Sequence, residues 1–70
     1  MKEKITNNVN VLRVKANITQ GELAEKVGVT RQTIIAIEKG NYTPSVLLAL
    51  KIASFFKKPI EEVFHIKYEK

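Results

Sequence analysis

The chain has 70 residues, no cysteine, and a net charge of +5 from 12 basic and 7 acidic residues. That length predicts one domain with a shallow core, which a second subunit would stabilise. Without cysteine, disulfides and thiolate chemistry are excluded. No apolar run approaches the roughly 20 residues of a membrane span, and no signal peptide pattern opens the chain, so we expect a cytoplasmic protein that does not associate with membranes.

The excess of positive charge favours a polyanionic partner, because neutralised phosphates release counterions. Solubility alone is the alternative explanation, and charge does not choose between the two. The decision therefore depends on motifs along the chain.

The N-terminal segment contains a loosely alternating stretch followed by a helical pattern. Residues 1–6 alternate, and Thr6 or Asn7 can cap a first helix that runs to about Ala16. Val9 and Leu12 recur on one face of that helix at helical spacing. Arg13 lies on the same face, which we expect to be partly buried.

Residues 19–40 predict two short helices joined by a tight turn. Thr19 and Glu22 form a capping box, and Gly28 follows the first helix where a left-handed residue is favoured. Thr30 can cap the second helix, which ends at Gly40. Small Ala24 permits the two helices to cross closely, and Ile34 and Ile37 form the inward face. This pattern is a helix-turn-helix.

The stretch QGELAEKVGVTRQTIIAIEKG resembles the motif of small phage-repressor-like transcriptional regulators along its whole length. This family includes the lambda and 434 repressors of the Cro and C1 type (XRE), and the chain is similar to its short cytolysin-repressor members. The resemblance implies an all-α, five-helix DNA-binding domain over residues 1–70. Its recognition helix would cover about residues 31–39.

The C-terminal third predicts two further helices and a strand. A fourth helix, 46–56, carries two apolar stripes. The first consists of Val46, Ala49, Leu50, Ala53 and Phe56, and the second of Leu48, Ile52 and Phe55. One stripe suffices for the core, so we expect the second to be covered by the terminal segments and another subunit. A short fifth helix would run from Ile60 to Phe64. Alternation after Phe64 predicts a strand pairing antiparallel with residues 1–6; a frayed tail is the alternative.

The resemblance also implies an ion pair between the first helix and the recognition helix. Family members pair an arginine with a glutamate at the positions of Arg13 and Glu38. Two ordinary solvated charges are the alternative.

The recognition helix provides candidate DNA contacts at its N-terminal end and on its outward face. The residues expected to read bases are Gln20, Arg31, Gln32, Thr33 and Ala36. Arg31 replaces the glutamine of 434-like members and favours guanine. Ile35 could meet thymine methyl groups or only cover its neighbours. The residues expected to contact phosphates are Thr19, Thr30, Lys39, Asn41, Tyr42 and Thr43. Tyr42 could instead pack on Pro44.

Together these features predict a transcriptional regulator. Its simplest form is a repressor that binds a palindromic double-stranded DNA operator as a homodimer. The dimer interface is expected at Leu48, Ile52, Phe55, Val63, Phe64 and Ile66. In a prokaryote or phage this protein would associate with the nucleoid. The rival function is a protein-binding helix-turn-helix, such as an antitoxin or adaptor. The polar face of Arg31, Gln32 and Thr33 favours DNA.

An enzyme is not indicated by the sequence. His65 is the single histidine and lies in the tail, and the adjacent Glu61 and Glu62 point apart on a helix. The chain shows no metal-ligand spacing and no phosphate-binding glycine loop. We therefore expect no metal, no cofactor and no small-molecule ligand.

Overall fold

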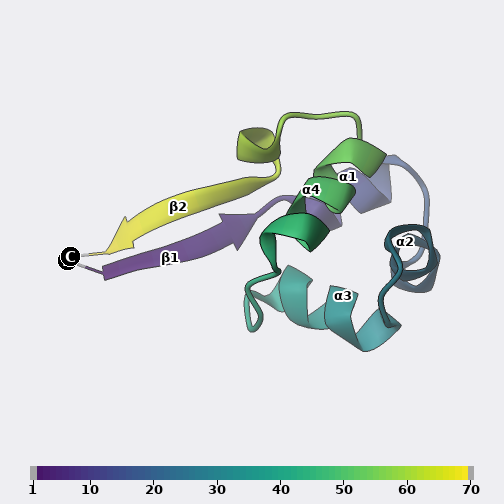
Figure 1. Cartoon of the computed structure of the whole chain (residues 1–70), viewed down its shortest axis with the longest axis horizontal. Helices are drawn as coiled ribbons and strands as arrows, with labels where there is room; N and C mark the ends of the chain where they lie inside the picture. Colours follow the sequence, from purple (N-terminus) through teal and green to yellow (C-terminus); the bar gives the residue numbers. More distant parts are fainter. Residues whose placement is uncertain (1, 70) are drawn as a thin grey trace.

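The structure, a computed structural model, describes residues 2–69 and the side chains of residues 3–68. Four α-helices form a body from which a two-stranded sheet projects (Figure 1). The elements are β1 (Lys2–Asn7), α1 (Val9–Lys15), α2 (Gln20–Val27), α3 (Arg31–Lys39), α4 (Val46–Phe55), the 3-10 turn η1 (Ile60–Glu62) and β2 (Phe64–Glu69). Within residues 2–69, no helix is long and apolar enough to cross a membrane.

The predicted fifth helix is wrong. In its place the described chain has the single 3-10 turn η1, and the backbone enters β2 at Phe64. The Val63 carbonyl accepts a hydrogen bond of 2.9 Å from the Asn8 amide, at the point where the two terminal segments meet. Pairing with the N-terminal segment therefore takes up the residues that a second helical turn would need.

The helix-turn-helix has the predicted caps and turns. The Thr19 hydroxyl accepts from the Glu22 amide at 3.0 Å, and the Glu22 carboxylate accepts from the Thr19 amide at 2.8 Å. Gly28 and Gly40 have left-handed backbones with φ of 78° and 80°. The Thr30 hydroxyl accepts from the backbone amide of Thr33, which caps α3. Local polar groups thus fix both ends of α2 and α3.

The core joins every helix and the end of the 3-10 turn. Its largest fully buried side chains are Val9, Leu23, Ile34, Ile37, Ile52 and Val63. Because Ile34 and Ile37 point into this core, the opposite face of α3 is turned outward.

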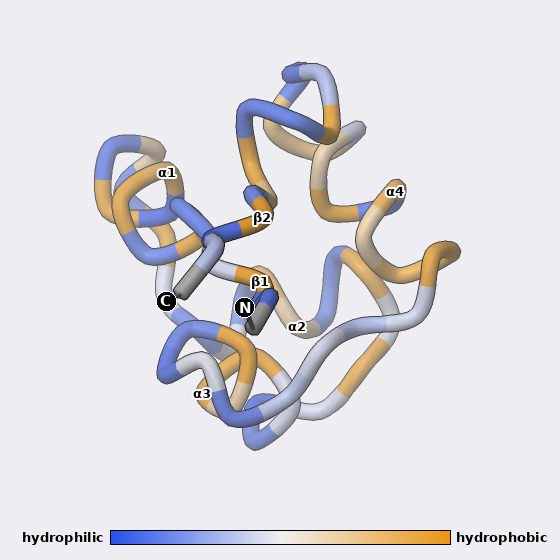
Figure 2. Tube along the Cα trace, turned by 90° about the vertical axis from the view of Figure 1, so that its left-hand side faces the viewer, coloured by the Kyte–Doolittle hydropathy of each residue, from blue (hydrophilic) through white to orange (hydrophobic). Residues whose placement is uncertain are grey.

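Helix α4 packs against the core through a different set of residues from either apolar stripe that the sequence predicted. Figure 2 shows α4 as a mostly apolar segment, so hydropathy alone does not select its inward face. The buried residues of α4 are Leu48, Ala49, Ile52 and Ala53, whereas Val46 and Leu50 are 75% and 49% exposed. The inward edge therefore takes residues from both predicted stripes.

This packing corrects part of the predicted dimer interface. Leu48, Ile52 and Val63 are 7%, 0% and 0% exposed within the single chain, because α4 and the end of η1 close the core through them. They offer almost no surface to a second subunit. Phe55 and Phe64 are half-buried and Ile66 is exposed, so these three remain accessible.

The predicted terminal sheet is present, and the described tail is not frayed. Strands β1 and β2 pair antiparallel, with Lys4 opposite Lys67 and Ile5 opposite Ile66. Alternation gives the sheet two faces. We call Ile5, Phe64, Ile66 and Tyr68 the apolar face, which also holds Glu3 and Asn7. Among residues 3–68 the opposite face, which we call the basic face, holds Lys4, Thr6, His65 and Lys67.

Only the base of the terminal sheet is held by the body. A two-stranded sheet is marginally stable alone. The Asn7 side-chain amide donates to the Ile37 carbonyl at 2.9 Å, and the Asn8 side-chain amide donates to the Glu62 carbonyl at 3.2 Å. Ile5 and Phe64 border a hollow beside Val46 at the start of α4. The sequence reasoning placed α4 beneath the sheet, but α4 reaches only this base.

The turn geometry predicts unequal effects of alanine at three glycines. Gly28→Ala and Gly40→Ala should each lower the free energy of unfolding by about 1–2 kcal/mol, because an L side chain is strained in the left-handed region. Gly21→Ala, inside α2, is the matched control, since its new Cβ would lie 3.9 Å from the nearest Arg31 atom. Its stability should stay constant or rise by up to about 1 kcal/mol. Urea unfolding measures all three, and equal effects would contradict the assigned turns.

Candidate nucleic-acid interface

Helix α3 presents its polar residues on the outside of the body. Arg31 and Gln32 are exposed in its first turn and Lys39 is exposed in its last, while Thr33 and Ala36 are half-buried. Thus α3 is held by its apolar face and leaves side-chain donors and cations free at both ends.

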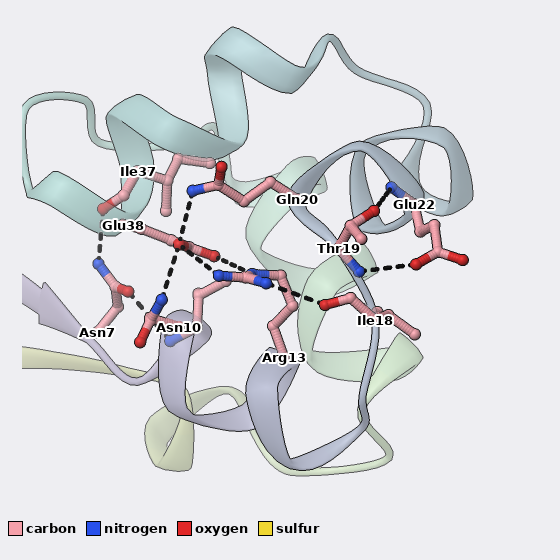
Figure 3. Close-up of polar contacts among 10 residues, drawn as sticks. Asn7, Asn10, Arg13, Ile18, Thr19, Gln20, Glu22, Ile37 and Glu38 are labelled. Atoms are coloured by element: carbon pink, nitrogen blue, oxygen red, sulfur yellow. Dashed lines mark hydrogen bonds and ion pairs between the residues drawn. The ribbon is translucent and has the colours of Figure 1, made fainter.

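An ion pair fixes α3 against α1, as the sequence predicted. Arg13 Nε lies 2.8 Å from Glu38 Oε2, and Arg13 Nη2 donates to Oε1 at 3.3 Å (Figure 3). Arg13 Nη1 also donates to the Ile18 carbonyl at 2.9 Å. The two side chains are 13% and 6% exposed, so they are not ordinary solvated charges. This is the only ion pair found among the side chains of residues 3–68.

Two side-chain amides complete the shell around Glu38, and the sequence reasoning missed both contacts. Asn10 Nδ2 and Gln20 Nε2 each donate to Glu38 Oε1 at 3.1 Å (Figure 3). Asn10 precedes Arg13 by three residues and so shares its helix face, a signal that could have revealed its role. The carboxylate fixes the orientation of the Gln20 amide, because a carbonyl oxygen in that position would face a negative charge. Gln20 is therefore restrained, with one of its two amide N–H donors occupied.

The Glu38 carboxylate stays ionised despite its small exposure. Burial raises the pKa of Glu38, but hydrogen bonds from Arg13, Asn10 and Gln20 together hold it below the ordinary value of 4.5. Its negative charge is therefore a stable part of the fold at neutral pH.

The start of α2 offers less to a phosphate than the sequence suggested. The Thr19 amide donates to the Glu22 carboxylate, and hydrogen bonding of that carboxylate, first with the Thr19 backbone and then with the Thr19 side chain, lowers the pKa of Glu22. A phosphate at this helix end would meet the charge of Glu22. The Thr19 contribution is thus limited to its hydroxyl proton.

The start of α3 carries two hydroxyls in contact. The oxygens of Thr30 and Thr33 lie 3.0 Å apart, and one must donate to the other. The remaining proton of the pair can point outward. The pair therefore keeps one hydroxyl donor for a neighbouring phosphate or base edge.

The loop after α3 places the other expected phosphate contacts at the surface. Asn41, Tyr42 and Thr43 are exposed, and the Asn41 amide donates to the Ala36 carbonyl at 2.9 Å. The Tyr42 ring is 47% exposed and borders a shallow hollow beside Val29. These groups lie next to Lys39 at the C-terminal end of α3. No set of three or more His, Cys, Asp or Glu residues within the described part of the chain could hold a metal ion.

The sequence profile of the helix-turn-helix family matches residues 11–63. The chain belongs to this family. Its members are DNA-binding transcriptional regulators.

Individual relatives agree with this assignment. An uncharacterized HTH-type transcriptional regulator of Methanocaldococcus jannaschii is 57% identical over 58 residues, covering 83% of this chain and 88% of the relative. The transcriptional repressor RstR of a cryptic phage in Vibrio cholerae is 34% identical over 83% of this chain and 52% of its own length. The structure of the transcriptional regulator VanUg shares the fold, with a TM-score of 0.76 and 21% identity over 99% of this chain and 92% of that chain.

The nearly buried Glu38 predicts a large stability loss when its charge is removed. Glu38→Gln strands the Arg13 cation and should lower the free energy of unfolding by about 3–5 kcal/mol. Glu25→Gln, at an exposed position of α2, is the matched control and should change it by less than about 0.5 kcal/mol. Urea unfolding at pH 7 measures both, and similar small losses would show that the ion pair contributes little.

The same pair predicts a pH dependence. Because the pKa of Glu38 is lower in the folded state, its stabilisation is present above pH of about 4.5 and is lost as pH falls through the folded pKa. The stability difference between the wild type and Glu38→Gln should therefore shrink below that pH. Subtracting the variant removes the parallel contribution of Glu22. A difference that is constant down to pH 3 would be inconsistent with this assignment.

Proposed function

We propose that this helix-turn-helix regulator is a repressor that occupies a palindromic operator as a homodimer, with α3 in the major groove. One observation carries the proposal. The first turn of α3 exposes Arg31 and Gln32 while the same helix is anchored in the core through Ile34 and Ile37. The relative RstR, described as a phage transcriptional repressor, supports repression as the mode of regulation.

Base reading is assigned mainly to the first two turns of α3. Arg31 can donate two parallel hydrogen bonds to O6 and N7 of guanine, and Gln32 can bond to N6 and N7 of adenine. Thr33 and Ala36 lie further along and can contact thymine methyl groups. Gln20 is restrained by Glu38, which takes one of its two N–H donors, so its carbonyl oxygen can accept a hydrogen bond from an exocyclic amine of a base. Each DNA half-site is therefore contacted by one restrained side chain, Gln20, and by two side chains that can adjust their conformation, Arg31 and Gln32.

Phosphate contacts are assigned to the two sides of α3. Thr19 and Thr30 supply hydroxyls near its N-terminal end. Lys39 supplies a cation at the other end, followed by the polar loop of Asn41, Tyr42 and Thr43. Such contacts fix the register of the protein on the duplex without selecting a sequence.

The dimer interface is assigned to exposed apolar side chains at the start of α4 and on the apolar face of the sheet. Val46 is 75%, Leu50 49% and Ile66 54% exposed. Ile5 connects the two areas, because it borders the same hollow as Val46. Contiguous apolar surface of this kind on a small domain indicates an interaction site. A twofold axis here would present two α3 helices to half-sites about 34 Å apart.

A protein-binding function, as in an antitoxin or adaptor, is the competing proposal. The two differ in their response to salt, because DNA binding releases counterions. Titration of a fluorescent random-sequence duplex at several salt concentrations separates them. Affinity that falls steeply with salt supports the DNA function, and affinity that is indifferent to salt would refute it.

Two substitutions on α3 should affect DNA binding in different ways. Arg31→Ala should cost about 1–3 kcal/mol on the selected operator and relax base preference at one position, because it removes a base contact. Lys39→Ala should weaken the operator and random duplexes alike. Selection of bound duplexes from a random pool gives the operator, and fluorescence titration gives both affinities. Equal losses on the two duplexes for Arg31→Ala would exclude a reading role.

The revised interface predicts which apolar residue controls assembly. Leu50→Glu should convert a dimer into a monomer, because it places a charge in the apolar contact. Val11→Glu, at a 51% exposed position on α1, is the matched control and should leave the dimer intact. Analytical ultracentrifugation at micromolar concentration measures both. A monomeric wild type, or equal behaviour of the two variants, would contradict the interface.

A further inference from the structure

We propose that the basic face of the terminal sheet contacts the phosphate backbone of the DNA beside the bound half-site, through Lys4 and Lys67. This surface lies outside the helix-turn-helix. The inference rests on the proposed DNA binding and assigns the sheet a second function besides its contribution to a dimer.

The first observation is a pair of like charges in direct register. Lys4 lies opposite Lys67 in the antiparallel ladder, and both side chains are exposed. Like charges directly opposite each other destabilise a sheet, and a two-stranded sheet has little stability to lose. Glu3 cannot compensate from its position, because alternation places it on the apolar face. Neither lysine has an ion-pair partner among the side chains of residues 3–68.

The second observation is that this face continues the surface at the end of α3. Lys4 and Thr6 border one hollow together with Lys39, Gly40 and Asn41. The bond from Asn7 to the Ile37 carbonyl holds β1 against that end of the helix. In Figure 1, β1 is the strand nearer to α3. A phosphate strand that passes Lys39 and Asn41 therefore meets Lys4 next, and Lys67 beside it.

The two faces of the sheet are complementary in what they would bind. The apolar face turns toward the hollow beside α4, and the basic face is its reverse. A polyanion across Lys4 and Lys67 would relieve their repulsion at the same time as a partner covers the apolar side. An acidic protein segment could also neutralise two lysines, but the continuity with Lys39 favours DNA.

The decisive experiment measures how binding depends on salt. The double variant Lys4→Gln/Lys67→Gln removes two phosphate contacts per subunit, so the slope of log affinity against log salt should fall by about 1.8 per bound subunit. The matched control, Lys57→Gln/Lys58→Gln, removes the same charge from the loop between α4 and η1, which Figure 1 places at the far end of the body from α3. The control should keep the wild-type slope. The probe is a random-sequence duplex, titrated at several salt concentrations.

A second variant separates binding from folding. Lys4→Glu creates an opposite-charge pair with Lys67 in the same register, so the melting temperature should hold or rise. Binding to DNA should nevertheless weaken, on operator and random duplexes alike. A merely structural role for Lys4 would instead make affinity follow stability.

The outcomes distinguish this inference from the proposed function. A wild type whose affinity depends on salt, with the same slope in the folded Lys4→Gln/Lys67→Gln variant, overturns the inference and leaves DNA binding by α3 in place. A fall in slope equal to that of the control also overturns it, because the effect then comes from net charge alone. A wild type indifferent to salt removes the proposed function itself.

Discussion

The arrangement of the helices depends on one carboxylate. Glu38 comes from α3, and its partners Arg13 and Asn10 come from α1 and Gln20 from α2. A nearly buried charge is tolerated only when its hydrogen bonds are satisfied, so any displacement of one helix leaves a partner unpaired. In this small domain the Glu38 contacts and the burial of Ile34 and Ile37 together fix the direction of α3.

This constraint has consequences for how the interface can adapt to DNA. Gln20 enters the interface already bonded to Glu38, whereas Arg31 and Gln32 are exposed and free of such a restraint. Asn7 ties the same C-terminal end of α3 to β1, through the Ile37 carbonyl next to Glu38. Helix α3 is thus tied to α1, α2 and β1 through its last turn, and adjustment to a base sequence is left to side chains of its first turn. A rigid helix with mobile readers loses less entropy on binding than a helix that must first be ordered.

Most of the features that the sequence predicted correctly are decided within a few residues. The exceptions are the terminal sheet, predicted from alternation at both ends of the chain, and the Arg13–Glu38 pair, implied by the family resemblance. The capping box of Thr19 and Glu22 and the turn at Gly28 are local, as is the alternation that gives β2. The failures are non-local. The fifth helix was lost because Val63 and the residues after it pair with the N-terminal segment, more than fifty positions away. The face of α4 was misassigned because a helix that is apolar on most sides has no periodicity from which to choose.

The same distinction between local and long-range features applies to the candidate site. The exposure of Arg31 and Gln32 followed from the burial of Ile34 and Ile37, which the spacing predicted. The restraint on Gln20 could not be predicted in this way. Its hydrogen bond to Glu38 depends on the distance between α2 and α3, which only tertiary packing sets. The basic face of the terminal sheet was also beyond reach, since its register brings together residues from opposite ends of the chain. A sheet so far from the core is a marginal structure by itself. In the proposed dimer on DNA both its apolar and its basic face would be covered, so assembly and DNA binding would each strengthen the other by ordering the same element.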